Sequence, residues 1–331
     1  MNRSWEGRAV LVTGAGGFIG SHLVQRLVHQ GAAVRAFVRY TSRGDIGLLR
    51  MLTSEELALL TIESGDLRDA GAVTRAVEGM EIVFHLGASI SIPYSYRHPV
   101  EVAETNVLGT LNVLLACKEQ GIGRLVHVSS SEVYGTAREV PISENHALQG
   151  QSPYAATKIG ADKLAESFTC AFGLPVVTIR PFNTYGPRQS ARAVIPTIIT
   201  QALAQGTVRL GRLDPSRDFT FVSDTVRGLE CGAQAEGVEG MTFNLGTGTY
   251  IAVGELAQKI ITLVGRSVRI VSDAQRLRAE GSEVYRLHAD NRRAQELLDW
   301  SPRIPLDEGL RNTIHWISAH LDRFRPADYQ V

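Results

Sequence analysis

The chain has 331 residues, of which 44% are hydrophobic and 21% are charged, as in ordinary soluble globular proteins. Its 34 Lys and Arg residues balance its 34 Asp and Glu residues, so no global field attracts nucleic acid or an anionic membrane surface. Any anionic ligand must therefore be held by local groups.

The first predicted strand covers residues 8–14 and leads through a glycine turn into a helix over residues 21–31. The strand begins close to Met1, which leaves no room for the apolar region of a signal peptide. No later run of about 18 apolar residues predicts a membrane-spanning helix. We therefore expect a cytoplasmic protein that has neither a membrane nor a nucleic acid as its partner.

Further apolar strands alternate with helical stretches along the first half of the chain. Continuous rather than alternating apolar strands indicate a parallel sheet that is covered on both faces. The strands are predicted over residues 33–39, 59–66, 81–88, 124–131 and 175–181. The sequence thus predicts an α/β fold, a Rossmann-like doubly wound sheet over residues 1–180.

After Pro181 the pattern loosens, and short strands mix with basic loops. We expect residues 181–331 to form a smaller substrate lobe, except that a segment near 219–264 returns to the sheet. Residues 241–253 predict one more strand, and residues 291–321 predict two helices separated by a proline loop.

The three cysteines are widely spaced and lack both CxxC spacing and a nearby histidine cluster. Cys117, Cys170 and Cys231 are therefore expected to be buried, reduced thiols. No metal site is expected.

The segment "TGAGGFIGSHL" places Gly14, Gly17 and Gly20 between the first strand and the first helix. The first glycine permits a tight turn, the second lets the backbone approach a pyrophosphate, and the third allows close helix packing. This predicts a dinucleotide site. The GxxGxxG spacing, with Ile19 where other dehydrogenases have their last glycine, resembles the short-chain dehydrogenase/reductase superfamily.

The end of the second strand reads "AFVRYTSRGD" and lacks the acidic residue that binds the ribose hydroxyls of NAD. Arg39 stands at that position, which favours the 2′-phosphate of NADP. NAD stays open, because Arg39 could also stack on adenine or point to solvent, and Asp45 could reach back.

Downstream, Tyr154 and Lys158 are four residues apart on a predicted helix and therefore share one face. The Lys158 ammonium is expected to lower the pKa of the Tyr154 phenol and to bind the nicotinamide ribose. Tyr154 then becomes a general base near neutral pH. By resemblance to the superfamily, the hydroxyl of Ser130 holds the substrate oxygen while a secondary alcohol is oxidised.

Glu132 follows in "SSSEVYG" and is not required for that oxidation. It is either structural or acts on a neighbouring carbon. In a hexose, a ketone at C4 acidifies the hydrogen on C5, so a carboxylate there removes it and drives loss of the C6 hydroxyl as water. Returned hydride then gives a 4-keto-6-deoxy sugar.

The motifs "TGAGGFIG", "GDLRD", "SSSEVYG", "YAATK", "RPFNTYGPR" and "RDFTFV" together resemble the extended, nucleotide-sugar-modifying branch of the superfamily. The segments from residue 140 to 203 look most like nucleotide-activated N-acetylglucosamine 4,6-dehydratases of legionaminic-type acid pathways. The resemblance implies a redox-neutral 4,6-dehydratase acting on a UDP- or GDP-N-acetylglucosamine-like sugar, with tightly bound, recycled NAD or NADP. It also implies a homodimer through a four-helix bundle built from the helix near residues 101–120 and the helix that carries Tyr154.

The resemblance assigns roles to individual residues. The catalytic residues would be Ser130, Glu132, Tyr154 and Lys158. Asp66 would reach the adenine amino group, Leu67 would pack on the ring, and Asn106 would support the active-site backbone. The full cofactor-binding set is Gly14, Gly17, Phe18, Ile19, Gly20, Arg39, Asp66, Leu67, Tyr154, Lys158 and Pro181. The substrate-binding set is Ser130, Ser131, Asn183, Arg188, Arg217 and Arg278, in which Arg217 and Arg278 clamp the diphosphate.

Two departures from the family pattern leave alternatives open. Ser131 replaces the aspartate that precedes the glutamate in dTDP-glucose dehydratases, so the acid for the C6 hydroxyl is not identified. Ala279 follows Arg278 where a proline is usual. Because decarboxylases and some epimerases also keep a glutamate in this context, a nucleotide-sugar 4-epimerase acting on a UDP-hexose or UDP-uronic acid is the alternative. A non-catalytic NADP-binding regulator is disfavoured by the intact Ser130, Tyr154 and Lys158.

Overall fold

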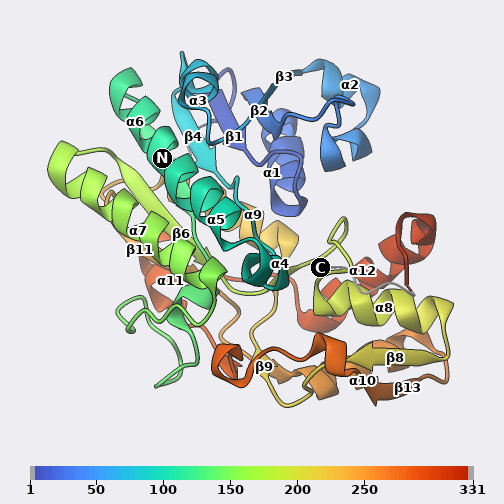
Figure 1. The fold of residues 1–331 in the computed structure, drawn as a ribbon. Coiled ribbons are helices and arrows are strands. Elements are labelled where there is room, and N and C mark those ends of the chain that lie inside the picture. Colours follow the sequence, from blue (N-terminus) through green and yellow to red (C-terminus); the bar gives the residue numbers. More distant parts are fainter. Residues whose placement is uncertain (1–3, 327–331) are drawn as a thin grey trace.

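In the computed structural model, which describes residues 4–326, a parallel seven-stranded sheet forms the centre of the larger lobe (Figure 1). The strand order is β11-β6-β5-β4-β1-β2-β3. The strands are β1 (Ala9–Thr13), β2 (Ala33–Arg39), β3 (Leu60–Gly65), β4 (Ile82–His85), β5 (Arg124–Val128), β6 (Val176–Pro181) and β11 (Thr242–Leu245). The predicted α/β fold with a Rossmann-like parallel sheet is confirmed.

Helices cover both faces of this sheet, as the continuous apolar strands predict. Val10 and Val12 of β1 face the core under α1 and α9, whereas Leu11 between them faces the core under α3, α6 and α7. One face carries α1 (Phe18–His29), α9 (Val222–Gln234) and α11 (Arg292–Leu298), and the other carries α3 (Ala70–Val77), α6 (Gly109–Gln120) and α7 (Pro153–Phe172). Shorter helices are α2 (Ser54–Ala58), α4 (Ile92–Arg97) and α5 (Pro99–Ala103).

Helix α7 has clear start and stop signals. The Ser152 hydroxyl accepts a hydrogen bond from the amide of Ala155, Pro153 occupies the first helical position, and Gly173 ends the helix with a φ of 67°. The first two turns, which carry Tyr154 and Lys158, are therefore fixed relative to the end of β5 and the loop before the helix.

The smaller lobe lies beside the carboxyl ends of the strands (Figure 1). It contains α8 (Val194–Ala204), α10 (Val253–Val264) and α12 (Leu306–Ala319) with the paired strands β8 (Thr207–Leu210) and β13 (Arg269–Ser272). Short strands complete it: β7 (Thr184–Tyr185) with β10 (Thr220–Phe221), and β9 (Ser216–Arg217) with β12 (Ile251–Ala252) and β14 (Arg286–Leu287). The division into a domain over 1–180 and a lobe over 181–331 stays a prediction.

Two expectations about apolar segments need correction. Among the described residues, the helical stretch Pro99–Gln120 is long and apolar enough to cross a membrane by length and composition, although the sequence pattern did not single it out. In this fold 44% of the most apolar 18-residue part of this stretch is buried. The stretch packs against α3 and α7. Of the three cysteines expected to be buried, Cys117 is buried, Cys231 is half-buried, and Cys170 on α7 is exposed.

The sheet has a topological switch point at β1. β1 pairs with β2 on one side and with β4 on the other, so the chain leaves it in opposite directions. In doubly wound sheets, ligands bind in the crevice outside the carboxyl ends of the strands at such a point.

Candidate active site

A cavity of about 620 Å³ lies at this switch point. It is lined by nine of the predicted cofactor-binding residues and by four residues of the serine-rich segment after β5. These are Gly14, Gly17, Phe18, Ile19, Gly20, Arg39, Tyr154, Lys158 and Pro181, together with Ser129, Ser130, Ser131 and Glu132. The structure therefore brings segments more than 160 residues apart to one site.

The glycine turn has no space for side chains. Gly14 has a φ of +68°, and a Cβ there would lie 2.8 Å from the amide nitrogen of Gly87. A Cβ on Gly20 would lie 2.2 Å from the carbonyl oxygen of Gly14. The N-terminus of the 12-residue helix α1 follows, and no side chain caps it. Amide donors that point into a cavity from a glycine turn suit a pyrophosphate, so these residues fit a dinucleotide.

Asp66 and Leu67 do not line this cavity. The Asp66 carboxylate accepts hydrogen bonds from the Arg68 guanidinium, 2.7 Å away at Oδ2, and this bonding lowers its pKa. Leu67 is buried and packs against Gly87 and Gly109. Their roles toward adenine stay predictions.

Arg39 ends β2 and lines the cavity with most of its side chain exposed. Its guanidinium lies 3.5 Å from Glu101 Oε1. Asp45 also lines the cavity, but its carboxylate accepts a hydrogen bond from the Gly47 amide and pairs with Arg50. Arg39 is thus the more available of the two groups for a ribose or a ribose phosphate.

Tyr154 and Lys158 lie one turn apart on α7 and are both buried. The Lys158 ammonium donates a hydrogen bond of 2.8 Å to the carbonyl oxygen of Val128, at the end of β5. Burial lowers the pKa of Lys158 to about 8, against the charge of Asp162. Burial raises the pKa of Tyr154 to about 12, although a hydrogen bond with Ser130 opposes this.

The net lowering expected for the Tyr154 pKa is not found in this structure, because desolvation of the phenolate outweighs the hydrogen bond that lowers it. A bound nicotinamide cofactor would supply a cationic hydride acceptor beside this pair. The hydrogen bond between Tyr154 and Ser130 nevertheless brings together the two predicted groups for a substrate hydroxyl.

A second cavity of about 570 Å³ opens from the first toward the smaller lobe. Glu132 and Asn183 line both cavities, so the two meet at these side chains. The second cavity is rich in arginine: its charged lining residues are Arg97, Arg192, Arg212, Arg217, Arg276 and Arg278 with Glu132 and Glu283. This excess of guanidinium groups suits a substrate with several negative charges.

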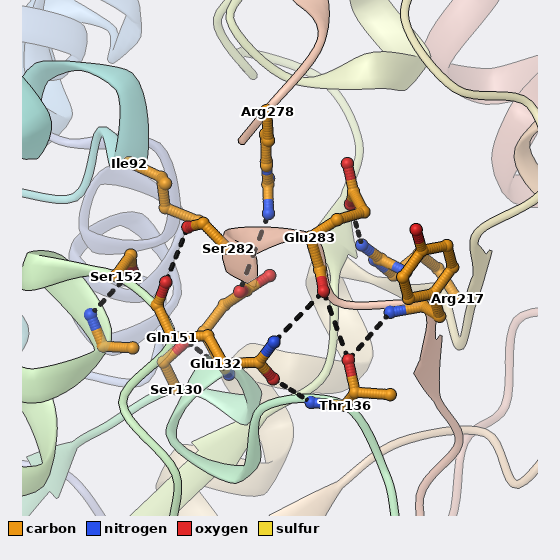
Figure 2. Close-up of polar contacts among 12 residues, drawn as sticks. Ile92, Ser130, Glu132, Thr136, Gln151, Ser152, Arg217, Arg278, Ser282 and Glu283 are labelled. Carbon is orange, nitrogen blue, oxygen red and sulfur yellow. Dashed lines mark hydrogen bonds and ion pairs between the residues drawn. The ribbon is translucent and has the colours of Figure 1, made fainter. Parts of the chain in front are cut away.

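Figure 2 shows Arg278 extending from the smaller lobe toward Glu132, with 3.8 Å between Nη1 and Oε2. Arg217 is buried, and its Nη2 lies 3.6 Å from Glu283 Oε1. Both predicted clamp arginines thus lie in the second cavity beside a carboxylate. Glu283 was missed by sequence reasoning, because it lies in a basic loop segment without a motif.

Arg188 does not lie where the resemblance put it. Its backbone has a φ of 70°, and its guanidinium turns to helix α1, where Nη2 donates a hydrogen bond of 2.7 Å to Gln25. It lines neither cavity, so the assignment to the substrate lobe needs correction. The adjacent Gln189 lines both cavities instead.

Asn106 is buried within a single π-helical turn, Glu104–Leu108, between α5 and α6. Its amide donates to the Ser89 carbonyl oxygen and to the Thr157 hydroxyl, both at 3.0 Å, and its oxygen accepts from the Ser89 amide at 2.7 Å. Asn106 therefore joins the loop after β4 to the residue that precedes Lys158. π-Helical turns are frequent at functional sites.

Comparison with known proteins finds similarity along most of the chain. The family described as GDP-mannose 4,6 dehydratase matches residues 11–313. A UDP-glucose 4-epimerase of Mycolicibacterium smegmatis is 34% identical over 92% of this chain and 97% of its own length. A dTDP-glucose 4,6-dehydratase of Streptomyces griseus is 32% identical over 96% of both chains.

Two solved structures are similar throughout. The dTDP-glucose 4,6-dehydratase DesIV of Streptomyces venezuelae, with NAD and TYD bound, has a TM-score of 0.85 and 30% identity, covering 96% of this chain and 99% of its own. MoeE5 in complex with UDP-glucuronic acid and NAD has a TM-score of 0.84 and 34% identity, covering 94% and 99%.

Proposed function

This chain belongs to the GDP-mannose 4,6-dehydratase family, within the extended short-chain dehydrogenases/reductases, and from that premise we propose that it is a redox-neutral nucleotide-sugar 4,6-dehydratase. The product is a 4-keto-6-deoxy sugar nucleotide. Relatives of both dehydratase and 4-epimerase type exist, so the choice between the two reactions rests on the site itself.

The observation that carries the proposal is the place of Glu132. Its carboxylate lies where the cofactor cavity meets the arginine-rich cavity, on the turn that follows Ser130. A 4-epimerase needs a hydroxyl and a phenol at C4 and has no chemical step for a carboxylate, although some epimerases keep a glutamate in the same sequence context. Dehydration needs a base for the C5 hydrogen, and Glu132 supplies one.

In the proposed reaction Ser130 holds the C4 hydroxyl. Tyr154 acts as the phenolate, which the positive charge of a bound oxidised nicotinamide would favour, and removes the hydroxyl proton while hydride leaves C4. Lys158 holds the ribose of the cofactor. With the ketone formed at C4, Glu132 removes the C5 proton, and the C6 hydroxyl takes a proton from solvent and leaves as water. A bound nicotinamide would hold the hydride taken from C4 and give it back at C6. A solvent proton then replaces the one lost from C5, so no net oxidation occurs.

The substrate we propose is UDP- or GDP-N-acetylglucosamine or a close analogue. The arginines of the second cavity support a nucleoside diphosphate, with Arg217 and Arg278 on the phosphates. The resemblance of residues 140–203 to legionaminic-type dehydratases supports the N-acetylglucosamine part. Similar proteins are known with NAD bound, which supports a nicotinamide cofactor, and Arg39 leaves NADP as a second form.

A homodimer and a cytoplasmic location belong to the same proposal. Helices α6 and α7 lie side by side (Figure 1). Large apolar side chains of Pro99–Gln120 and of α7 are exposed. They are Val100, Leu108, Leu115 and Phe172. A second copy of these two helices would cover them in a four-helix bundle.

The test is product mass. The purified protein is incubated with NAD or NADP and a panel of UDP-, GDP- and dTDP-sugars, and the products are weighed by mass spectrometry. Loss of one water without net accumulation of reduced nicotinamide is the expected result. If the product has unchanged mass and inverted configuration at C4, the protein is a 4-epimerase and the dehydratase proposal is wrong.

A further inference from the structure

The proposed catalytic side chains come from two separate elements. Tyr154 and Lys158 belong to helix α7, whereas Glu132 belongs to the 3₁₀ turn Ser131–Tyr134. Oxidation at C4 and proton removal at C5 act on adjacent carbons of one sugar, so the distance between the two elements must be held closely.

One buried side chain contacts both elements. Arg180 on β6 donates hydrogen bonds from Nε and Nη2 to Oδ2 of Asp162, at 3.0 and 2.9 Å. Its Nη1 donates to the hydroxyl of Tyr134 at 2.9 Å. Asp162 lies one turn after Lys158 on α7, and Tyr134 ends the turn that contains Glu132. The planar guanidinium therefore connects α7 to this turn through a fixed fork.

Two further polar contacts extend this network. The Tyr134 hydroxyl donates a hydrogen bond of 2.7 Å to Oδ1 of Asn244, and Oδ1 of Asp162 lies 3.2 Å from Nε2 of His127. All of these side chains are buried. Nδ1 of His127 has no hydrogen-bond partner among the described residues, whereas the other contacts named here are formed. A bonded polar network in a low-dielectric interior is rigid, because each lost contact would leave a desolvated group.

The protonation states keep the network intact. Burial would raise the pKa of Asp162, but the hydrogen bond with His127 and the charge of Arg180 lower it to about 2. Burial raises the pKa of Tyr134 to about 12, so its hydroxyl keeps the proton that it donates to Asn244. Neither group changes charge across the neutral range.

We propose that Arg180 is a positioning residue that sets Glu132 relative to Tyr154 through Tyr134 and Asp162. The proposal rests on the proposed role of Glu132 as the C5 base. Arg180 and Tyr134 touch neither cavity that would hold the cofactor or the sugar, so they act only through the elements that they connect.

The test is Tyr134→Phe, which keeps the packed ring and removes only the hydroxyl between Arg180 and Asn244. Three quantities are measured with the sugar nucleotide that the wild type accepts: single-turnover reduction of nicotinamide, loss of water by mass, and deuterium incorporation at C5. Since a displacement of about 1 Å costs about 100-fold, we expect the last two to fall about 10- to 100-fold. Oxidation at C4 stays within about threefold, because Ser130, Tyr154 and Lys158 are untouched.

The matched control is Thr313→Val. It also removes one buried hydroxyl, which donates 2.7 Å to the Gly309 carbonyl oxygen within α12, away from both cavities. It should lower the melting temperature as Tyr134→Phe does and leave both steps at the wild-type rate. If Tyr134→Phe does not fold, Arg180→Lys keeps a cation beside Asp162, lacks the fork that reaches Tyr134, and must show the same separation of the two steps.

If Tyr134→Phe slows both steps equally, or slows neither, the positioning role is overturned. The proposed function still stands in that case, provided that the wild type dehydrates the sugar. If the wild type never removes water, the proposed function fails by itself. Crystal structures of the wild type and of Tyr134→Phe then decide the positioning role of Arg180. If the turn 131–134 keeps its place relative to Tyr154 in the variant, the role is overturned. If the turn is displaced, the role is upheld.

Discussion

Arg278 and Glu132 face each other across the junction of the two lobes, with 3.8 Å between Nη1 and Oε2. The arginine comes from the smaller lobe and the glutamate from the end of β5, so one ion pair joins the substrate side to the proposed base (Figure 2). A phosphate oxygen that enters this cavity competes with Glu132 for the same guanidinium.

Arg278→Gln should therefore raise the KM for the sugar nucleotide more than it lowers kcat. Loss of a charge-assisted hydrogen bond costs about 1.5–3 kcal/mol, which corresponds to about a 10- to 100-fold rise in KM. Steady-state kinetics measure both constants. The control Arg209→Gln removes an exposed arginine of β8 that lines neither cavity and should change neither constant. A fall in kcat alone for Arg278→Gln would argue against a substrate contact.

Glu132→Gln separates the two chemical steps. The amide keeps the size of the side chain but cannot take a proton, so water loss and deuterium incorporation at C5 should fall by about 10²–10⁴. Oxidation at C4 should persist. Tyr154→Phe should abolish both steps, because no ketone forms without a base for the C4 hydroxyl. Near wild-type dehydration by Glu132→Gln, read by product mass, would make Glu132 structural.

Arg39→Asp tests the cofactor. Arg39 lies at the end of β2 with most of its side chain exposed, where a 2′-phosphate would meet it. If it binds that phosphate, the substitution should weaken NADP by about tenfold or more and NAD much less, as a charge-assisted contact is lost. Titration calorimetry with both nucleotides measures this. Equal weakening of the two would remove the assignment.

The pH dependence should separate activity from stability. Lys158 has a pKa of about 8 in the fold, lowered by burial from 10.5, so its ammonium is lost as the pH rises through 8 and activity should fall there. In the same range the unfolded chain binds the additional proton, so the stability contribution of Lys158 rises with pH. As the pH rises through 8, kcat/KM should therefore fall while the contribution of Lys158 to the melting temperature rises.

Asp162→Asn should move the loss of activity to a lower pH, because the Asp162 charge is the contact that raises the Lys158 pKa. The two buried imidazoles nearby, His85 and His127, have pKa values lowered first by burial and do not replace that charge. An unchanged alkaline limb in Asp162→Asn would show that Lys158 does not govern it.

The proposed dimer has its own test. Leu108→Glu and Leu115→Glu place charges on the exposed apolar surface of the stretch Pro99–Gln120 and should convert a dimer to a monomer. Leu297→Glu, on the equally exposed surface of α11, should leave the dimer intact. Static light scattering at micromolar concentration measures the mass, and a monomeric wild type would contradict the proposal.

Some features of this protein were determined by the sequence alone because they lie within one element. Gly14, Gly17 and Gly20 lie at three-residue spacing along the turn and the start of α1, and Tyr154 and Lys158 are one turn apart on one helix. Local geometry fixes such sets once the strand and helix are recognised. The continuous apolar strands likewise determined the parallel, doubly covered sheet.

Only the tertiary structure decided which distant side chains meet. The sequence assigned Arg188 and Arg217 alike to the substrate-binding set. In the structure Arg188 bonds to Gln25 on α1, whereas Arg217 pairs with Glu283 in the second cavity. The Tyr154 pKa rises rather than falls, because burial outweighs the hydrogen bond with Ser130 that lowers it. Desolvation and long-range pairing depend on how whole elements pack, and residue spacing along the chain carries no record of that packing.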